Sequence, residues 1–457
     1  MNQIFEILEN KGVLKKDKVR VETLARFNKK QILELMEDLG SLTPPTDTAP
    51  NKHQLAHCAS FSLGGGREEC YNVGCRMQRL ESLARFATLY SDKVYIRNYF
   101  ASYDHLKNLS KDRLAEYFLD DIYLLSLIRP IMAAGLMEFM GGKEAACPKC
   151  LAARIGPTEK SSSYLQKAVS RLSLDYLNNT QVSLEKDEKE FILHLEGSEL
   201  YYDHGGLLLV FNRIPNSLRS KPMLLSKLKK EGVIHLSKKE ARKINFHKVM
   251  AQEVLENLTY EVIMKSELDT SFVTNREIHI AFLQKFGQDD EVTRRNQLAY
   301  KHMTALVPFL EDVPLGKLLK LRERERFSFL QFRAALNKSI DQLYRTKGKF
   351  SEGDAKSIYF DIIAPELARL DKRVKAAKKD LITSLIRSAT GTLGAISFGL
   401  YTGIIPYEIA SIAKALGLVK FGSDMIQKFM SLGDGAKTIQ QKDLYFLWKV
   451  KQVADKT

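Results

Sequence analysis

Four cysteines have the spacing of ligands for a single metal ion. Cys147 and Cys150 are two residues apart in the segment CPKC, and Cys70 and Cys75 form a second pair with four residues between them. Two neighbouring thiolates can bind one ion, and zinc requires four ligands in a tetrahedron. The sequence therefore predicts a structural zinc site formed by Cys70, Cys75, Cys147 and Cys150, because four thiolates leave no open position for catalysis.

Other interpretations of these cysteines stay open. The same thiolates suit an iron–sulfur cluster, the 147/150 pair suits a redox dithiol, and buried thiols often pack as small hydrophobic groups. His57 and Cys58 are reserve ligands. An odd total of five cysteines fits a disulfide framework poorly, and the first residues have no secretory signal pattern. We therefore expect a cytoplasmic protein.

Basic residues suggest a polyanionic partner. The chain has 70 Lys and Arg against 55 acidic residues, a net charge of +15. Such a charge can bind nucleic-acid phosphates through counterion release, although it equally suits an anionic membrane, an acidic protein or a solvated surface. Few aromatic residues interrupt the main tract, which favours contact with the backbone over stacking on single-stranded bases. Its candidate nucleic-acid-binding residues are Arg213, Arg219, Lys227, Lys229, Lys230, Lys238, Lys239, Arg242 and Lys243.

An uncharged segment near the C-terminus indicates a membrane as an alternative partner. Residues 388–407 contain no charge, and Gly391, Ala395, Gly399 and Gly403 recur at every fourth position. On a helix these small residues form one stripe that permits close helix packing, in a membrane or in a soluble hairpin. A second apolar run follows Pro406, so residues 388–419 define a candidate membrane-contacting hairpin.

No motif identifies a catalytic site, and the sequence does not decide whether the protein is an enzyme. Asp203 and His204 are adjacent in YYDHGG, but neighbours in a hairpin often point to opposite faces. Gly64, Gly65 and Gly66 lack the Lys-Ser/Thr that completes a phosphate-binding loop.

Helices account for most of the predicted structure. Apolar spacing predicts helices in the first forty residues and over 77–89, 111–129, 164–176, 246–268 and 277–286, a long charged helix after Pro314, and a helical C-terminal unit. Ser237 with Glu240, and Thr274 with Glu277, fit the capping box at a helix start and help to place the helices 246–268 and 277–286. Short alternating runs between 181 and 211 predict strands, the only β-rich stretch that we identify.

The predicted protein is mainly α and multi-domain, with a small β-sheet insert near residues 181–211 and a zinc-stabilised helical N-terminal half. Its segments are a helical start (1–40), a proline-rich linker (41–54), a cysteine-containing helical domain (55–176), a basic α+β domain (177–345) and a helical C-terminal unit (346–457). The leading hypothesis is an intracellular binding or adaptor protein that contacts nucleic acid, in a bacterial stress or phage-defence setting. Alternatives are a membrane-perturbing effector that uses residues 388–419, and a hydrolase or nuclease with an unrecognised site.

Overall fold

The chain divides into two compact units, Met1–Met303 and Thr304–Thr457. The boundary falls inside the segment 177–345 that the sequence suggested as one domain. Both units contain helices, and the described part of the chain is mainly α, as predicted. The computed structural model describes residues 2–15, 18–42, 55–67, 72–102, 107, 109–140, 158–187, 190–196, 206–211, 221–276, 279, 313–347 and 445–454.

The first forty residues are helical, as predicted, and also contain a short hairpin. Asn28 caps the helix α3 (Lys29–Gly40) in a reciprocal capping box with Gln31, which satisfies two backbone N–H groups at the helix start. Leu8, Ile32 and Leu39 are fully buried beneath these helices. The elements are α1 (Asn2–Asn10), β1 (Leu14–Lys15), β2 (Lys18–Val19), α2 (Val21–Arg26) and α3 (Lys29–Gly40).

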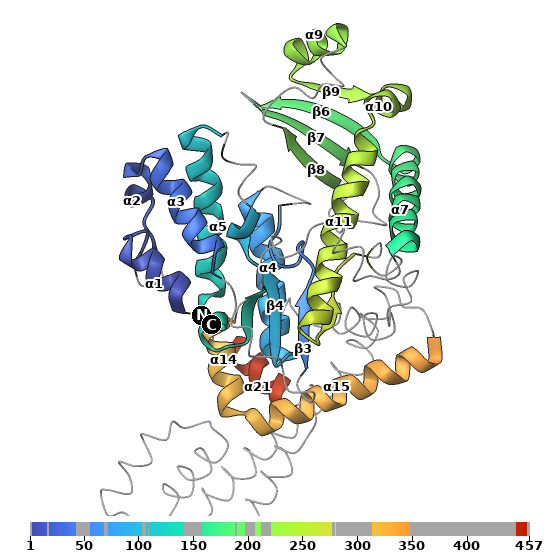
Figure 1. The fold of residues 1–457 in the computed structure, drawn as a ribbon. Coiled ribbons are helices and arrows are strands. Elements are labelled where there is room, and N and C mark those ends of the chain that lie inside the picture. Colours follow the sequence, from blue (N-terminus) through green and yellow to red (C-terminus); the bar gives the residue numbers. More distant parts are fainter. Residues whose placement is uncertain are drawn as a thin grey trace, which may run out of the picture. The chain divides into compact units, whose positions relative to one another are not determined.

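A four-stranded parallel sheet follows in the first unit (Figure 1). Its strands are β3 (Ala56–Ala59), β4 (Lys93–Arg97), β5 (Met137–Met140) and β10 (Ser271–Val273). Helix α4 (Val73–Leu89) connects β3 to β4. The 3-10 helix η1 (Tyr99–Ser102) and α5 (Lys111–Ala133) lead from β4 to β5. The spatial order is β10-β3-β4-β5, so the last strand in sequence pairs with the first and the strand order reverses beside β3.

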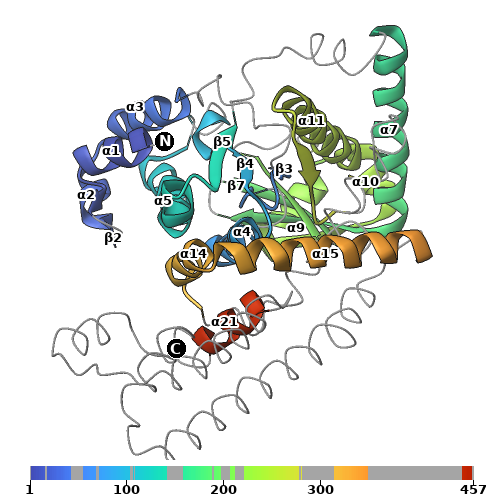
Figure 2. The same ribbon diagram turned by 90° about the horizontal axis from the view of Figure 1, so that it is seen from below.

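Helices cover both faces of this sheet. Alternate residues of a strand point to opposite faces, and β3 shows this with His57 and Cys58. His57 packs against Phe86 and Tyr90 at the end of α4, whereas the Cys58 thiol contacts the Glu261 carbonyl on α11 (Phe246–Glu267). The two helices lie on opposite sides of β3 and β4 in Figure 2.

The prediction that residues 181–211 are the only β-rich segment is therefore wrong. Strands β3 and β5 are four residues long, and every residue in them is buried. A strand buried on both faces has no alternation of polar and apolar residues, so periodicity does not distinguish it from a buried helix. The sequences AHCA and MEFM also lack the β-branched residues that favour strands.

The predicted β insert is confirmed as part of a second, antiparallel sheet. The elements of this region are α7 (Thr158–Asn179), β6 (Gln181–Asp187), β7 (Glu190–Glu196), β8 (Gly206–Phe211), α9 (Pro222–Glu231), β9 (Val233–Leu236) and α10 (Lys238–Ile244). The strand order is β8-β7-β6-β9. Leu184 and Leu193 pair across β6 and β7 and are fully buried, together with residues of α7 and α11. The same core includes Cys58 of β3, so the segments predicted as two domains share one hydrophobic core.

In the second unit, the described residues form α14 (Leu315–Arg324), α15 (Arg326–Lys347) and α21 (Tyr445–Ala454). The charged helix predicted after Pro314 is thus two helices that meet at Glu325. The rings of Phe329 and Phe332 pack on Phe446, with centroids 5.4 and 5.9 Å away. This aromatic contact joins α15 to α21, which are about one hundred residues apart in sequence.

Candidate functional sites

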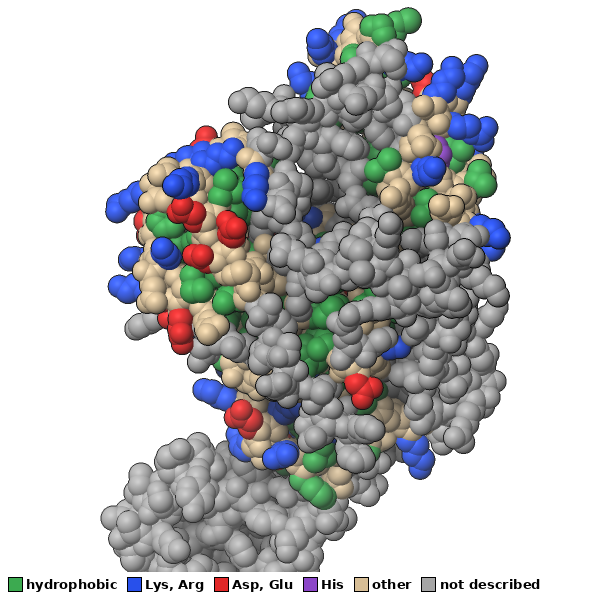
Figure 3. All heavy atoms as spheres, in the orientation of Figure 1, with side chains coloured by type: hydrophobic (Ala, Val, Ile, Leu, Met, Phe, Trp, Pro, Cys, Tyr) green, Lys and Arg blue, Asp and Glu red, His purple; other side chains and the backbone are tan. Residues whose placement is uncertain are grey.

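The basic residues of α9 and α10 form one exposed surface, which we call the α9–α10 basic surface. Lys and Arg side chains gather over these two helices at the top of Figure 3. The short edge strand β9 joins the helices and pairs with β6. The seven residues of the α9–α10 basic surface are all exposed: Lys227, Lys229, Lys230, Lys238, Lys239, Arg242 and Lys243.

Local structure holds α10 with its cations outward. Ser237 and Glu240 form the predicted capping box, and Asn245 ends the helix in the left-handed conformation. Ala241 is buried on the inner face. Lys239 and Lys243 are one helical turn apart, so they lie on the same exposed face.

Few carboxylates accompany these cations. Glu231 lies 4.0 Å from Lys227, and both side chains are about half exposed, so the pair is weak. Glu240 is engaged by Ser237, whose hydrogen bonds lower the pKa of this carboxyl below its ordinary value. Lys238 donates to the Asn178 carbonyl at 3.0 Å and so also attaches α10 to α7. The surface retains a clear positive excess.

Two further members of the predicted tract, Arg213 and Arg219, lie outside the described residues. The same holds for Asp203 and His204 and for the apolar segment 388–419. Within the described ranges, no helix is long and apolar enough to cross a membrane. The functions based on these segments therefore remain predictions.

Of the four predicted zinc ligands, the structure describes only Cys75, which is half-buried in the first turn of α4. Cys70, Cys147 and Cys150 lie outside the described residues, and the part of the chain that is described contains no group of three metal-binding side chains. Cys58 lies on β3, and its buried thiol contacts the Met140 sulfur and the Glu261 carbonyl of α11. Burial raises its pKa well above the ordinary value, so it stays protonated and suits packing rather than metal binding.

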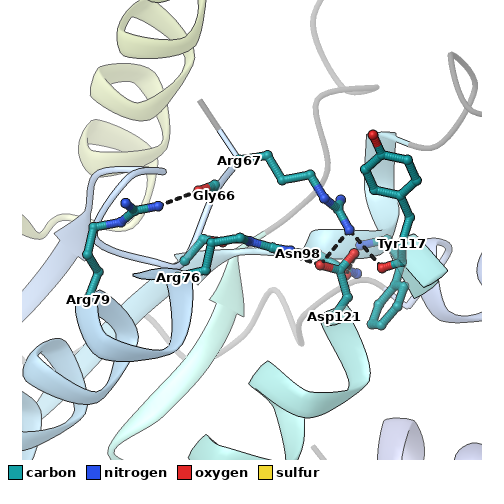
Figure 4. A network of polar contacts seen from close by, with 9 residues as sticks. Gly66, Arg67, Arg76, Arg79, Asn98, Tyr117 and Asp121 are labelled. Carbon is teal, nitrogen blue, oxygen red and sulfur yellow. Dashed lines mark hydrogen bonds and ion pairs between the residues drawn. The ribbon is translucent and has the colours of Figure 1, made fainter. Parts of the chain in front are cut away.

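The structure also assembles an arginine network that sequence reasoning missed. Arg76 on α4 and Arg67, before that helix, both contact the same oxygen of Asp121 on α5 (Figure 4). The Arg67 Nη2–Asp121 Oδ1 distance is 2.9 Å, and Arg67 also donates to the Tyr117 carbonyl at 2.8 Å. Asp121 and Arg76 have 0% and 1% of their side-chain surface exposed, and Arg67 has 17%. Two guanidinium groups are thus held side by side around one buried carboxylate.

The network surrounds the glycine loop that follows β3. Arg76 Nε donates to the Gly65 carbonyl at 2.8 Å, and Arg79 Nη2 donates to the Gly66 carbonyl at 2.9 Å. Gly65 has a φ of +83°, and a Cβ at Gly66 would lie 2.6 Å from the Phe61 carbonyl oxygen. The glycines are therefore required by the tight path of the loop.

The backbone donors of this loop are already used within it. The N–H groups of Gly64, Gly65 and Gly66 donate to the carbonyls of Ser60, Ser62 and Phe61, respectively. A phosphate-binding loop instead points such N–H groups at its ligand. The arginine side chains, rather than the loop amides, therefore carry the hydrogen-bond donors that a ligand could use in this region.

A sequence signal for these arginines does exist. Arg76 and Arg79 occupy the same helical period as the buried Leu80, Leu83 and Phe86. An arginine at a core position of an amphipathic helix needs buried acceptors, since an uncompensated buried charge is costly. The pattern indicates that partners exist, but it does not identify Asp121, which is 45 residues from Arg76.

A third group of polar residues follows β10. The Thr274 hydroxyl lies 2.9 Å from His279 Nδ1 and accepts from the Arg276 backbone N–H at 3.1 Å. Burial lowers the pKa of His279 well below its ordinary value, and the nearby Arg276 acts in the same direction. His279 is therefore neutral in the folded protein.

Comparison with known proteins assigns no relative. The chain matches no protein-family model, no curated protein and no solved structure. Function must therefore be inferred from the residues and their arrangement alone.

Proposed function

We propose that this chain is a nucleic-acid-binding protein that contacts the phosphate backbone through the α9–α10 basic surface. The single observation that supports the proposal is the exposure of seven Lys and Arg side chains on two neighbouring helices. Cations that contact phosphates release condensed counterions, which provides affinity without reading the base sequence. The predicted role is that of a binding or adaptor protein.

Backbone contact favours duplexes over single strands. The residues from 221 to 243 include no Phe, Tyr or Trp, the side chains on which unpaired bases stack. A regular duplex presents its phosphates in a fixed arrangement, which suits cations that are carried by two helices. We therefore expect a labelled duplex to bind at least as tightly as a single strand of the same length, with little dependence on sequence.

Fluorescence anisotropy of a labelled duplex and a labelled single strand tests the proposal with the full-length protein. If all seven cations contact phosphate, the slope of log K against log salt is about −6, and if half do so it is about −3. The Lys239→Glu/Lys243→Glu variant should weaken duplex binding at least tenfold and reduce the magnitude of the slope by about 2. Absence of binding at low salt would refute the proposal.

A matched control separates this surface from net charge. Lys30→Glu combined with Lys320→Glu changes the net charge equally at exposed positions outside the basic tract. We expect this control to bind like the unmodified protein. Equal loss of affinity in both double variants would show that binding depends on overall charge rather than on α9 and α10.

We further propose that Cys70, Cys75, Cys147 and Cys150 bind a structural zinc ion. The support is the spacing of the two pairs, together with the partial exposure of Cys75 at the start of α4. Such a site would join the start of α4 to a segment more than seventy residues away, and metal binding would add to the stability of the fold.

A further inference from the structure

The glycine loop and the arginine network lie where open α/β sheets bind ligands. In such sheets the ligand site lies at the carboxyl ends of the strands, beside the point where the strand order reverses. Here the order reverses beside β3. The loop after β3 contains Gly65 and Arg67, and Tyr99 directly follows β4. A Cβ on Gly65 would lie 3.5 Å from the Tyr99 hydroxyl, so both loops meet at this edge.

Two carboxylates of α5 face the two arginines among the residues that the structure describes. Arg67 and Arg76 contact the same oxygen of Asp121. Asp120, next along α5, is half-buried, which raises the pKa of its carboxyl, and the nearby Arg76 and Arg67 act in the opposite direction. An additional ligand would therefore be held by hydrogen-bond donors of the network that have no acceptor, since an unmade hydrogen bond to a buried group is costly.

Hydrogen-bond donors at the same place lack acceptors. Among the residues that the structure describes, Arg76 Nη1, Arg67 Nε and the Tyr99 hydroxyl are shielded from solvent and have no hydrogen-bond partner. Burial raises the pKa of Tyr99 far above its ordinary value, so its hydroxyl remains a donor. An unmade hydrogen bond to a buried charged group costs more than one to a neutral group. These three donors come from the loop, α4 and η1.

We propose that Arg67 and Arg76 bind a phosphoryl group at the carboxyl edge of the parallel sheet, with the Tyr99 hydroxyl as a third donor. The planar guanidinium group matches phosphate geometry and is the side chain that most often binds it through paired hydrogen bonds. A phosphate dianion supplies several acceptor oxygens for these donors. Arg79 has a different role, since its donors hold the carbonyls of Ser62 and Gly66 and so fix the loop.

The melting temperature of the full-length protein, titrated with inorganic phosphate at constant ionic strength, tests this site. We expect a saturable rise, because a ligand that binds only the folded state stabilises it. Arg67→Met should weaken the apparent phosphate affinity about tenfold to a hundredfold, as expected for a lost hydrogen bond to a charged group. The control Lys30→Gln removes an exposed cation in α3 and should titrate like the unmodified protein. Absence of a saturable rise, or unchanged affinity in Arg67→Met, would overturn the proposal.

A second variant distinguishes a ligand site from a purely structural network. Asp121→Asn removes the carboxylate that competes for both arginines, so phosphate should bind more tightly and raise the melting temperature more than in the unmodified protein. A structural network predicts a lower melting temperature with no dependence on phosphate, which would contradict the proposal. Because Arg67 is partly exposed and outside the α9–α10 basic surface, its variant also shows whether phosphate binding and duplex binding are separate.

The source of the phosphoryl group is resolved by parallel titrations with ATP and inorganic phosphate. Tighter binding of ATP than of phosphate, weakened by Arg67→Met, would identify a nucleotide. Equal affinities that both depend on Arg67 would identify a simple phosphate or phosphomonoester. Binding of ATP that is unaffected by Arg67→Met would place the nucleotide elsewhere and refute this site.

Discussion

Replacement of Asp121 by asparagine should destabilise the first unit strongly. The Asp121 side chain is completely buried and contacts both Arg67 and Arg76. The change preserves the size of the side chain but leaves two neighbouring guanidinium groups without their shared carboxylate. Removal of one partner from a buried ion pair costs about 3–5 kcal/mol. We therefore expect the free energy of unfolding of the first unit to fall by that amount in phosphate-free buffer.

A chain with two units need not unfold in one step, so the stability of the first unit must be measured separately. Amide hydrogen exchange followed by mass spectrometry does this, because it reports the protection of each peptide. Peptides from α4 and α5 should lose at least about a hundredfold in protection, while peptides from α15 in the second unit should change little. Glu34→Gln is a control of the same chemical kind. Its partner Lys30 is 3.7 Å away and both side chains are mostly exposed, so its loss should cost less than about 0.5 kcal/mol.

Equal effects of Asp121→Asn and Glu34→Gln would refute this reasoning, because burial would then have no influence on the value of the ion pair. A double variant provides a second check. If Arg76 and Asp121 compensate each other, Arg76→Met should cost less in the Asp121→Asn background than it does alone, by about 0.5–3 kcal/mol. Strict additivity would show that the two side chains do not stabilise one another.

Three other predictions concern the glycine loop, His279 and the cysteines. Gly66→Ala should destabilise the first unit by about 1–3 kcal/mol in denaturant unfolding, because its Cβ meets the Phe61 carbonyl at 2.6 Å. Gly64→Ala, whose Cβ contacts begin at 3.5 Å, should cost clearly less, and a reversed order would contradict this account of the loop. Since burial lowers the pKa of His279, the unfolded chain takes up a proton that the folded chain does not, and the free energy of unfolding should fall as the pH drops below about 6.5. Between pH 6.5 and 5.5 this contribution is about 1 kcal/mol, and His279→Asn should remove it, so an unchanged pH dependence in that variant would exclude His279 as its source. Elemental analysis should find about one zinc per chain, lost in Cys147→Ser, and metal-free protein with normal folding would end the zinc proposal.

The sequence determined the features whose physical cause is local. Apolar spacing located α4, α5, α7 and α11, since the helical period appears within a single segment. The capping box predicted at Ser237 is present, because its hydrogen bonds join residues three positions apart, but it begins the separate short helix α10 and not the helix 246–268 that it was expected to help place. The cations of α9 and α10 are close in sequence as well as in space. The candidate nucleic-acid interface was therefore visible in the sequence.

Tertiary structure alone decided the parallel sheet and the arginine network. The strands of the sheet are short and buried on both faces, so they carry no alternation, and their pairing joins segments such as β3 and β10 that lie more than two hundred residues apart. Arg67, Arg76 and Asp121 likewise come from segments that are distant in sequence, since Asp121 is 45 residues from Arg76. The spacing of residues along the chain predicts contacts only within one helix or turn. Contacts between distant segments depend on the free energy of packing the whole core, which no local pattern contains.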